Sequence, residues 1–185
     1  MMTSCCAIFG LVFLVITNLA IIIAFATPYW LELRSPYSFT GGENRGLWAY
    51  CSDEACTWVF QDHSIWRQRE SGWWIATQAL MSVGLALGLM SLLFATLALC
   101  CECRGCNCSH AIAGLLMIAF LVLGTSVVVF GINAHSDSSF KAEINWTKHA
   151  RARFSWSFWL GVGSSGLAFL TSLIYACEGR QSRRH

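Results

Sequence analysis

The chain has 185 residues, of which 56% are hydrophobic and only 12% are charged, and its formal net charge is +2. Soluble globular proteins carry about 25% charged residues, so this composition excludes an ordinary water-soluble domain. The weak positive charge also gives no support for nucleic-acid binding.

Charged residues are absent from four long stretches of the sequence. These stretches lie before Glu32, between Glu70 and Glu102, between Arg104 and Asp137, and between Arg153 and Glu178. Each exceeds the ~20 apolar residues that a helix needs to cross the hydrocarbon core of a membrane. A helix also satisfies its own backbone hydrogen bonds in lipid. We therefore expect four membrane-spanning helices in a single domain covering residues 1–185, near residues 5–27, 73–100, 111–133 and 154–177.

The first stretch has a second interpretation. Ala24-Phe25-Ala26 resembles the small-residue pattern that precedes a signal-peptidase cleavage site. However, the apolar run begins by Cys5, is about twice as long as the hydrophobic region of a signal peptide, and follows no Lys or Arg. A retained helix is the preferred interpretation, and cleavage is the alternative.

The loop 28–72 after the first helix has the patterns of extended structure. Pro28 ends the helix, and apolar and polar residues then alternate over residues 29–34, as in a half-exposed strand. Residues 46–51 form a second predicted extended stretch, and residues 57–60 a third, because β-branched and aromatic residues dominate there. The four residues between Cys51 and Cys56 would form the turn of a hairpin closed by a disulfide.

Two signals disagree about which side of the membrane holds the termini. An even number of spans places both termini, the turn 101–110 and the tail 178–185 on one side, with the loops 28–72 and 134–153 on the other. The loops hold eight of the twelve Lys and Arg residues, which by the positive-inside rule would put the loops in the cytosol. The isolated cysteine pair instead fits an oxidising exterior, and the cysteine-crowded turn fits the reducing cytosol. We follow the cysteines and expect cytoplasmic termini.

The turn between the second and third helices is dense in cysteine: Cys100, Cys101, Cys103, Cys106 and Cys108. Juxtamembrane cysteines are typical sites of reversible palmitoylation, which is the first interpretation. Unmodified thiols are the second. A zinc site is the third, because the usual two Cys-x-x-Cys pairs on separate loops are missing. In the loop 134–153, Asn145-Trp146-Thr147 is a sequon for N-glycosylation.

Small and polar residues within the apolar stretches predict how the helices pack. Gly84 and Gly88, and Gly161 and Ser165, have the spacing at which small residues allow helices to approach closely. Three uncharged polar residues are expected to form hydrogen bonds between helices: Asn18, Thr125 and Ser126. No ionisable residue lies in the middle of a span, which argues against a pump or a proton-coupled transporter.

The loop motif formed by Trp30, Gly46-Leu47-Trp48, Cys51 and Cys56 on four membrane helices resembles the claudin superfamily. This superfamily includes peripheral myelin protein and the epithelial and lens membrane proteins. The likeness covers nearly the whole chain, including residues 74–81 and residues 154–158, which look most like the claudin-like proteins of invertebrates. The spacing of the two cysteines is shorter than in vertebrate claudins and closer to the epithelial and lens members.

The resemblance implies a left-handed four-helix bundle crowned by a small extracellular antiparallel β-sheet. Its last strand would come from the second loop, near residues 141–146. The signature residues Trp30, Gly46, Leu47 and Trp48 would anchor the sheet, with the rings of Trp30 and Trp48 at the lipid boundary. Partner-binding surfaces would lie near residues 37–45 and 58–69.

The function that this resemblance implies is structural. We expect a plasma-membrane protein of cell–cell junctions that contacts membrane lipids, like molecules in the same membrane and partners on the opposing one, and so limits paracellular leakage. The alternative is an auxiliary subunit or trafficking regulator of a channel or receptor. No histidine has a nucleophile or carboxylate at motif spacing and no phosphate-binding loop is present, so we expect no enzyme, cofactor, metal or small-molecule substrate.

Overall fold

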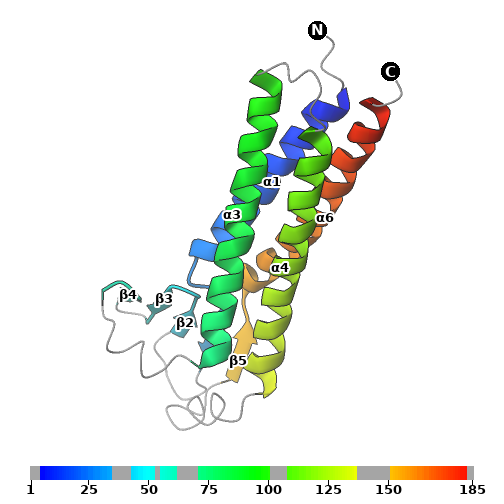
Figure 1. Ribbon diagram of the computed structural model, residues 1–185. Helices are drawn as coiled ribbons and strands as arrows, with labels where there is room; N and C mark the ends of the chain where they lie inside the picture. Colours follow the sequence, from blue (N-terminus) through cyan, green and yellow to red (C-terminus); the bar gives the residue numbers. More distant parts are fainter. Residues whose placement is uncertain are drawn as a thin grey trace.

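Four long helices lie side by side, with a small sheet at one end of the bundle (Figure 1). The computed structural model describes residues 5–34, 43–52, 55–61, 71–100, 108–136 and 151–182. The helices are α1 (Cys5–Ala26), α3 (Gly72–Cys100), α4 (Cys108–Ser136) and α6 (Trp156–Ser182). All four are long and apolar enough to cross a membrane. The predicted fold class, four spanning helices with a small antiparallel sheet, is confirmed.

The helices end where local chemistry stops them rather than where charge begins. α1 ends at Ala26, two residues before Pro28, because the residue before a proline is disfavoured in helical conformation. The last helix, α6, continues beyond its predicted end at residue 177, past Glu178 to Ser182. A helix needs an apolar surface only where it touches lipid, so its backbone can continue into the polar region. The start of α1 and the end of α6 lie at the end of the bundle away from the sheet (Figure 1).

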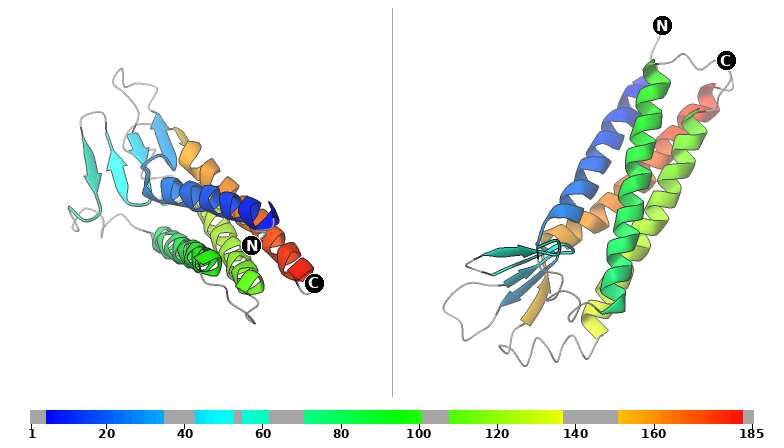
Figure 2. Two further views of the ribbon diagram at one scale, coloured as in Figure 1. Left: turned by 90° about the horizontal axis from the view of Figure 1, so that it is seen from above. Right: turned by 60° about the vertical axis from the view of Figure 1, so that its left-hand side comes forward.

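The sheet has five antiparallel strands in the order β4-β3-β2-β1-β5. The strands are β1 (Leu31–Arg34), β2 (Glu43–Arg45), β3 (Ala49–Cys51), β4 (Cys56–Trp58) and β5 (Arg151–Phe154). Four of them come from the loop after α1 and project beside the bundle, whereas β5 leads directly into α6 (Figure 2).

The predicted strands differ from the structure in their limits. The stretch expected at residues 29–34 is β1, which begins at Leu31. The stretch expected at residues 46–51 is a strand only over β3, which begins at Ala49. The residues before it form a turn, in which the Gly46 N–H donates to the Ala49 carbonyl at 2.8 Å. The stretch expected at residues 57–60 is β4, which ends at Trp58. A turn follows it, in which the Gln61 N–H donates to the Trp58 carbonyl at 2.9 Å.

The last strand lies later in the chain than expected. β5 occupies residues 151–154 and pairs Phe154 with Leu31, whereas the expected residues 141–146 lie outside the described ranges. The reason is connectivity. The Ser155 N–H donates to the Trp30 carbonyl at 3.0 Å and the Ser157 N–H donates to the Tyr29 carbonyl at 3.1 Å. The residues next to α6 therefore already lie along the chain that leaves α1, so they become the strand.

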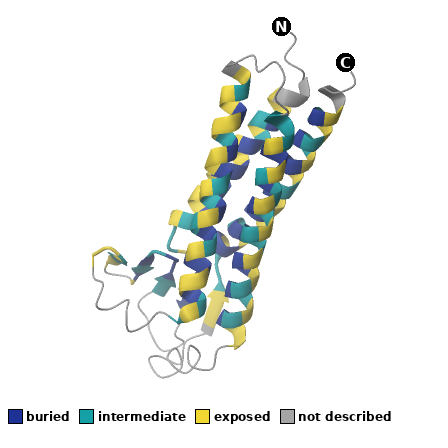
Figure 3. Ribbon diagram, viewed as in Figure 1, coloured by how far each residue is buried: buried dark blue, intermediate teal, exposed yellow. Residues whose placement is uncertain are grey.

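Buried apolar residues form two clusters at different heights in the bundle. The sheet-side cluster is rich in large rings and includes Trp30, Leu47, Trp74, Phe130 and Phe158. The distal cluster lies toward the other end and consists of Leu14, Ala95, Ile112, Ala113, Leu116 and Tyr175. Along each helix, buried residues face the other helices and exposed apolar residues face outward (Figure 3). The outward residues form the lipid-facing surface of a membrane protein.

The small residues singled out in the sequence lie between helices of the same chain. A Cβ atom added at Gly84 would lie 2.4 Å from the Leu123 side chain on α4, and one added at Gly88 would lie 2.8 Å from Asn18 Oδ1 on α1. At Gly161 the added atom would lie 3.4 Å from Val127 on α4. Glycine at the first two positions therefore permits α3 to pack closely against both neighbours.

The expected hydrogen bonds between helices are only partly correct. Ser126 Oγ on α4 donates to the Thr77 carbonyl on α3 at 3.2 Å. Asn18 Nδ2 and Thr125 Oγ1 instead donate to carbonyls one turn earlier in their own helices, because that carbonyl is always within reach of a short polar side chain.

Two contacts between helices were not anticipated. Thr17 and Thr171 join α1 to α6, with 3.2 Å between their hydroxyl oxygens, and Ser172 Oγ donates to the Ala113 carbonyl at 2.9 Å.

Candidate functional site

Trp30 is the central side chain of the junction between the bundle and the sheet. It lies immediately before β1, and its ring is fully buried. The ring packs edge-on against Phe130 of α4 and Phe158 of α6, with centroids 4.9 and 5.9 Å away. Its Nε1–H donates to the Ala24 carbonyl at 2.7 Å, one of the α1 carbonyls that has no partner within its helix. The expectation that Trp30 would lie at the lipid boundary is therefore wrong: it joins three helices inside the protein.

Gly46 lies where the sheet packs closely against the chain that leaves α1. A Cβ atom at this position would lie 2.4 Å from Pro28 Cα and 2.7 Å from the Thr27 carbonyl oxygen. Both are backbone atoms, so no side-chain rotation could relieve the clash. Only glycine allows the turn between β2 and β3 to pack onto the end of α1.

Leu47 fixes the same turn to α3. Its side chain is fully buried in the sheet-side cluster, and its carbonyl accepts a 2.7 Å hydrogen bond from Gln78 Nε2. Gln78 is 7% exposed, so this amide is satisfied inside the protein. The bond connects residues 31 positions apart and was not predicted, because nothing in the local sequence identifies the carbonyl that Gln78 reaches.

Trp48 has a more peripheral place than Trp30. Its ring is half-buried, lies 5.2 Å from that of Phe25 at the end of α1, and stacks on Phe60 at 6.0 Å with 7° between the planes. Its carbonyl accepts a hydrogen bond from the Val59 N–H at 3.0 Å. Trp48 therefore connects α1 to the hairpin formed by β3 and β4.

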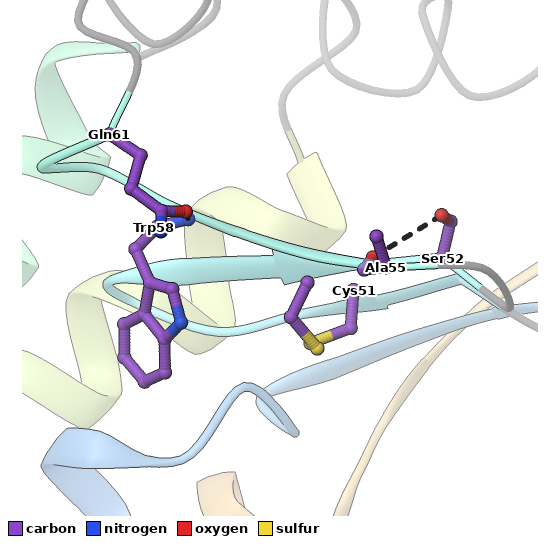
Figure 4. The surroundings of a disulfide bond; sticks show 6 residues. Cys51, Ser52, Ala55, Trp58 and Gln61 are labelled. Atoms are coloured by element: carbon purple, nitrogen blue, oxygen red, sulfur yellow. Dashed lines mark hydrogen bonds between the residues drawn. A yellow bond between two sulfur atoms is a disulfide. The ribbon is translucent and has the colours of Figure 1, made fainter.

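That hairpin is closed by a disulfide between Cys51 and Cys56 (Figure 4). The two cysteines face each other across β3 and β4, in register with the pair Ala49 and Trp58. Beside the bridge, the Ser52 N–H donates to the Ala55 carbonyl at 3.0 Å. The bridge and Trp58 lie on the same face of the hairpin, as alternate residues of a strand do (Figure 4).

Arg45 is a component of this junction that the sequence did not reveal. It is 8% exposed, and its guanidinium lies 5.4 Å from the centroid of the Trp74 ring on α3, within the range of a cation–π interaction. The expected partner-binding region at residues 37–45 therefore has a buried residue at its end. Residues 37–42 lie outside the described ranges, as do residues 62–69 of the second expected region.

Two further contacts join the end of α1 to the start of α6. The hydroxyls of Thr27 and Ser157 are hydrogen-bonded to each other. The rings of Tyr29 and Trp156 lie 5.5 Å apart. Together with the backbone bonds to residues 155 and 157, these contacts join the α1–β1 connection to the β5–α6 connection.

Most of the cysteine turn lies beyond the described residues. Cys101, Cys103 and Cys106 are outside them, the side chain of Cys100 is not described, and Asn145 is outside as well. Cys108 is a half-buried free thiol at the start of α4. Within the ranges that are described, no three His, Cys, Asp or Glu residues lie together as metal ligands would.

The arrangement can hold a sheet in a fixed position relative to a membrane. Trp30, Gly46 and Leu47 attach the sheet to all four helices, Gln78 and Arg45 add polar contacts to α3, and the disulfide closes the outer hairpin. These residues serve packing and positioning.

The comparisons with known proteins agree with this architecture. The family model described as PMP-22/EMP/MP20/Claudin family matches residues 3–175. Lens fiber membrane intrinsic protein of Rattus norvegicus is 26% identical over 166 residues, covering 88% of this chain and 85% of the relative. The Mus musculus protein gives the same values, and the Homo sapiens protein is 25% identical over 167 residues with the same coverage. The chain therefore belongs to the PMP-22/EMP/MP20/Claudin family of multi-pass membrane proteins.

Proposed function

We propose that this protein is a claudin-like component of cell–cell junctions in the plasma membrane, where it forms adhesive or barrier contacts that limit leakage between cells. The observation that carries the proposal is the close attachment of the sheet to the helices. Trp30 is buried among three helices, and Gly46 packs against the backbone at residues 27 and 28. A sheet held this firmly keeps its strands in a fixed position, which lowers the ordering cost of binding a partner.

Both termini are proposed to be cytoplasmic, with the sheet outside the cell. The disulfide between Cys51 and Cys56 supports this orientation, because structural disulfides persist in oxidising compartments. The two sequons, at Asn145 and Asn107, test it. A glycan on Asn107 would show the opposite orientation, whereas a glycan on Asn145 removed by a glycosidase at the surface of intact cells would support this one.

The junction proposal is tested by expressing the tagged chain alone in cells that lack junctional strands. We expect the protein to concentrate where two expressing cells touch and to form intramembrane strands visible by freeze-fracture. A variant with Trp30→Ala, which should lose the fixed sheet, is the matched control. Uniform surface distribution without strands, together with co-purification of a channel or receptor, would instead support an auxiliary subunit.

The charges of the two loops favour a barrier over a selective pore. The loop 28–72 has six acidic and four basic residues, a formal charge of −2, and the loop 134–153 has two acidic and four basic residues, a formal charge of +2. A selective pore needs fixed charge of one sign within about a Debye length of ~8 Å. Expression in a leaky epithelial layer should raise transepithelial resistance and leave the dilution potential nearly unchanged. A fall in resistance with clear cation preference would contradict this proposal.

The cysteine turn is proposed to carry thioester-linked acyl chains, with Cys100, Cys101, Cys103, Cys106 and Cys108 as the candidates. Labelling with a palmitate analogue should be sensitive to hydroxylamine and should disappear when all five are replaced by Ser. Persistent labelling would indicate that other cysteines carry the lipid. One candidate is Cys177, an exposed free thiol near the C-terminal end of α6.

A further inference from the structure

An apolar groove lies where the β3–β4 hairpin meets the end of α1. Its cavity volume is about 190 Å³, and five residues line it: Phe25, Ala26, Trp48, Trp58 and Phe60. Among the described residues no polar atom is exposed on its wall. The rings of Phe25, Trp48 and Phe60 form a continuous aromatic surface, since Trp48 contacts both of the others.

The groove continues the lipid-facing surface of α1. Exposed apolar residues recur along this helix at helical spacing: Ile8, Val12, Val15, Leu19 and Ile22. The next position at this spacing is Ala26, because residues three or four apart share one face of a helix, and Ala26 forms part of the groove wall. The exposed stripe therefore leads from the middle of the membrane directly into the groove.

The depth of the groove is set by α1, of which Phe25 and Ala26 are the last two residues. The groove thus lies at the end of a spanning segment, where the hydrocarbon core meets the interfacial region on the sheet side. This is the depth of the ester-proximal part of acyl chains in the sheet-side leaflet. Phe60 is 72% exposed at the rim, which is costly in water but is compatible with contact to lipid.

We propose that this groove binds the ester-proximal segment of a phospholipid acyl chain, which runs along the exposed stripe of α1 and ends under the hairpin. The cavity is smaller than the 300–1,000 Å³ typical of pockets that enclose a drug-sized ligand, so it fits a segment of a longer molecule. A narrow chain parallel to the helix follows both the stripe and the groove. The bound chain fills the space between α1 and the hairpin.

The test uses the full-length protein in lipid nanodiscs doped with phospholipids that carry a photoactivatable diazirine. One probe has the diazirine near the ester end of an acyl chain and the other has it near the terminal methyl. We expect the first probe to label Phe25, Trp48, Trp58 or Phe60, as located by peptide mass spectrometry, at several times the yield of the second. The two probes should differ little on the exposed middle of α1.

Two variants connect the labelling to the groove. Phe60→Ala removes the exposed rim, and Ala26→Leu fills the cavity from the α1 side. Each should reduce labelling of the groove residues at least threefold, whereas Trp159→Ala, a matched change at a 61% exposed aromatic residue on α6, should leave it unchanged. Formation of the disulfide between Cys51 and Cys56, followed by mobility in non-reducing gels, verifies that each variant is folded.

Three outcomes would overturn the proposal. Equal labelling by both probes, unaffected by either variant, would show that the groove contacts only bulk lipid and has no specific acyl-chain site. Preferential labelling of the same residues by a sterol photoprobe that competes with the phospholipid would assign the groove to a sterol. Cross-linking of a photoreactive side chain placed at position 60 to a second copy of the chain, without lipid adducts, would make the groove an interface between protomers.

Discussion

The two ends of the bundle are held together in different ways. At the sheet side, large rings reach from one element to another, and Trp30 alone contacts α4 and α6 while donating to α1. The distal cluster has smaller side chains, with Tyr175 its only aromatic residue among those described. The sheet-side end therefore depends on large rings at specific positions, whereas the distal end depends on fewer and smaller side chains.

The contrast has a physical basis in the membrane. Lipid tails are as apolar as leucine, so helices in a bilayer gain little from the hydrophobic effect and associate through close packing and hydrogen bonds. Close packing of small residues is sufficient for helix against helix, as at Gly84 and Gly88. A sheet has no such continuous surface against a bundle, so it is attached through individual large side chains and polar contacts.

The largest expected effect comes from removing the central ring. Trp30→Ala should lower the free energy of unfolding by about 3–5 kcal/mol, because it leaves a cavity among three helices and deprives the Ala24 carbonyl of its donor. Trp159→Ala, at an exposed site near the start of α6, should change the free energy of unfolding by less than ~0.5 kcal/mol. Unfolding by SDS in mixed micelles measures both. Similar losses for the two variants would refute the special status of Trp30.

The next effect tests close backbone approach. Gly46→Ala should cost about 3 kcal/mol, at the upper end of the range for over-packing, since the new methyl group would meet the backbone of Pro28 and Thr27. Gly163→Ala on α6, where no heavy atom lies within 4 Å of the added Cβ, should be neutral or stabilising by about 0.5 kcal/mol. Cell-surface biotinylation should show retention of the first variant only, and normal export of Gly46→Ala would contradict the assigned contact.

The disulfide should have a smaller and more local effect. Replacing Cys51 and Cys56 together by Ser opens a loop with a sequence separation of 5, for which chain entropy predicts a loss of about 2 kcal/mol. Hydrogen exchange should accelerate at β3 and β4 and remain unchanged at the distal ends of α4 and α6. Cys177→Ser, at an exposed free thiol, is the control. Faster exchange throughout the bundle would show that the two ends are not independent.

The smallest expected effect comes from the contact between Thr17 and Thr171, which lies between the two ends of the bundle. Thr17→Val and Thr171→Val should each cost about 0.6 kcal/mol, the average for hydrogen bonds between membrane helices. The double variant should cost less than the sum of the two, because both single changes break the same bond. Thr125→Val, which alters only a bond within α4, should show no coupling to Thr17→Val. Strict additivity of Thr17→Val and Thr171→Val would mean that their contact contributes nothing.

Some of the site was predictable from residues alone, and some was not. The hairpin with its cysteine pair followed from short-range pattern, because a strand, a turn and a strand are contiguous in the chain. The place of β5 did not, since its partner β1 lies more than 100 residues earlier. The burial of Arg45 was also not predictable, because charged residues are usually exposed and its partner ring belongs to α3.

The sequence by itself determined that the chain has four spanning helices and a cysteine-closed hairpin, because hydrophobic length and local turn pattern are properties of contiguous residues. The tertiary structure alone decided which side chains attach the sheet to the bundle. Trp30 became a buried link between helices instead of a lipid-facing ring, and Gln78 found the carbonyl of Leu47. Such contacts depend on where remote segments meet, and residue type gives no information about a partner that only folding brings near.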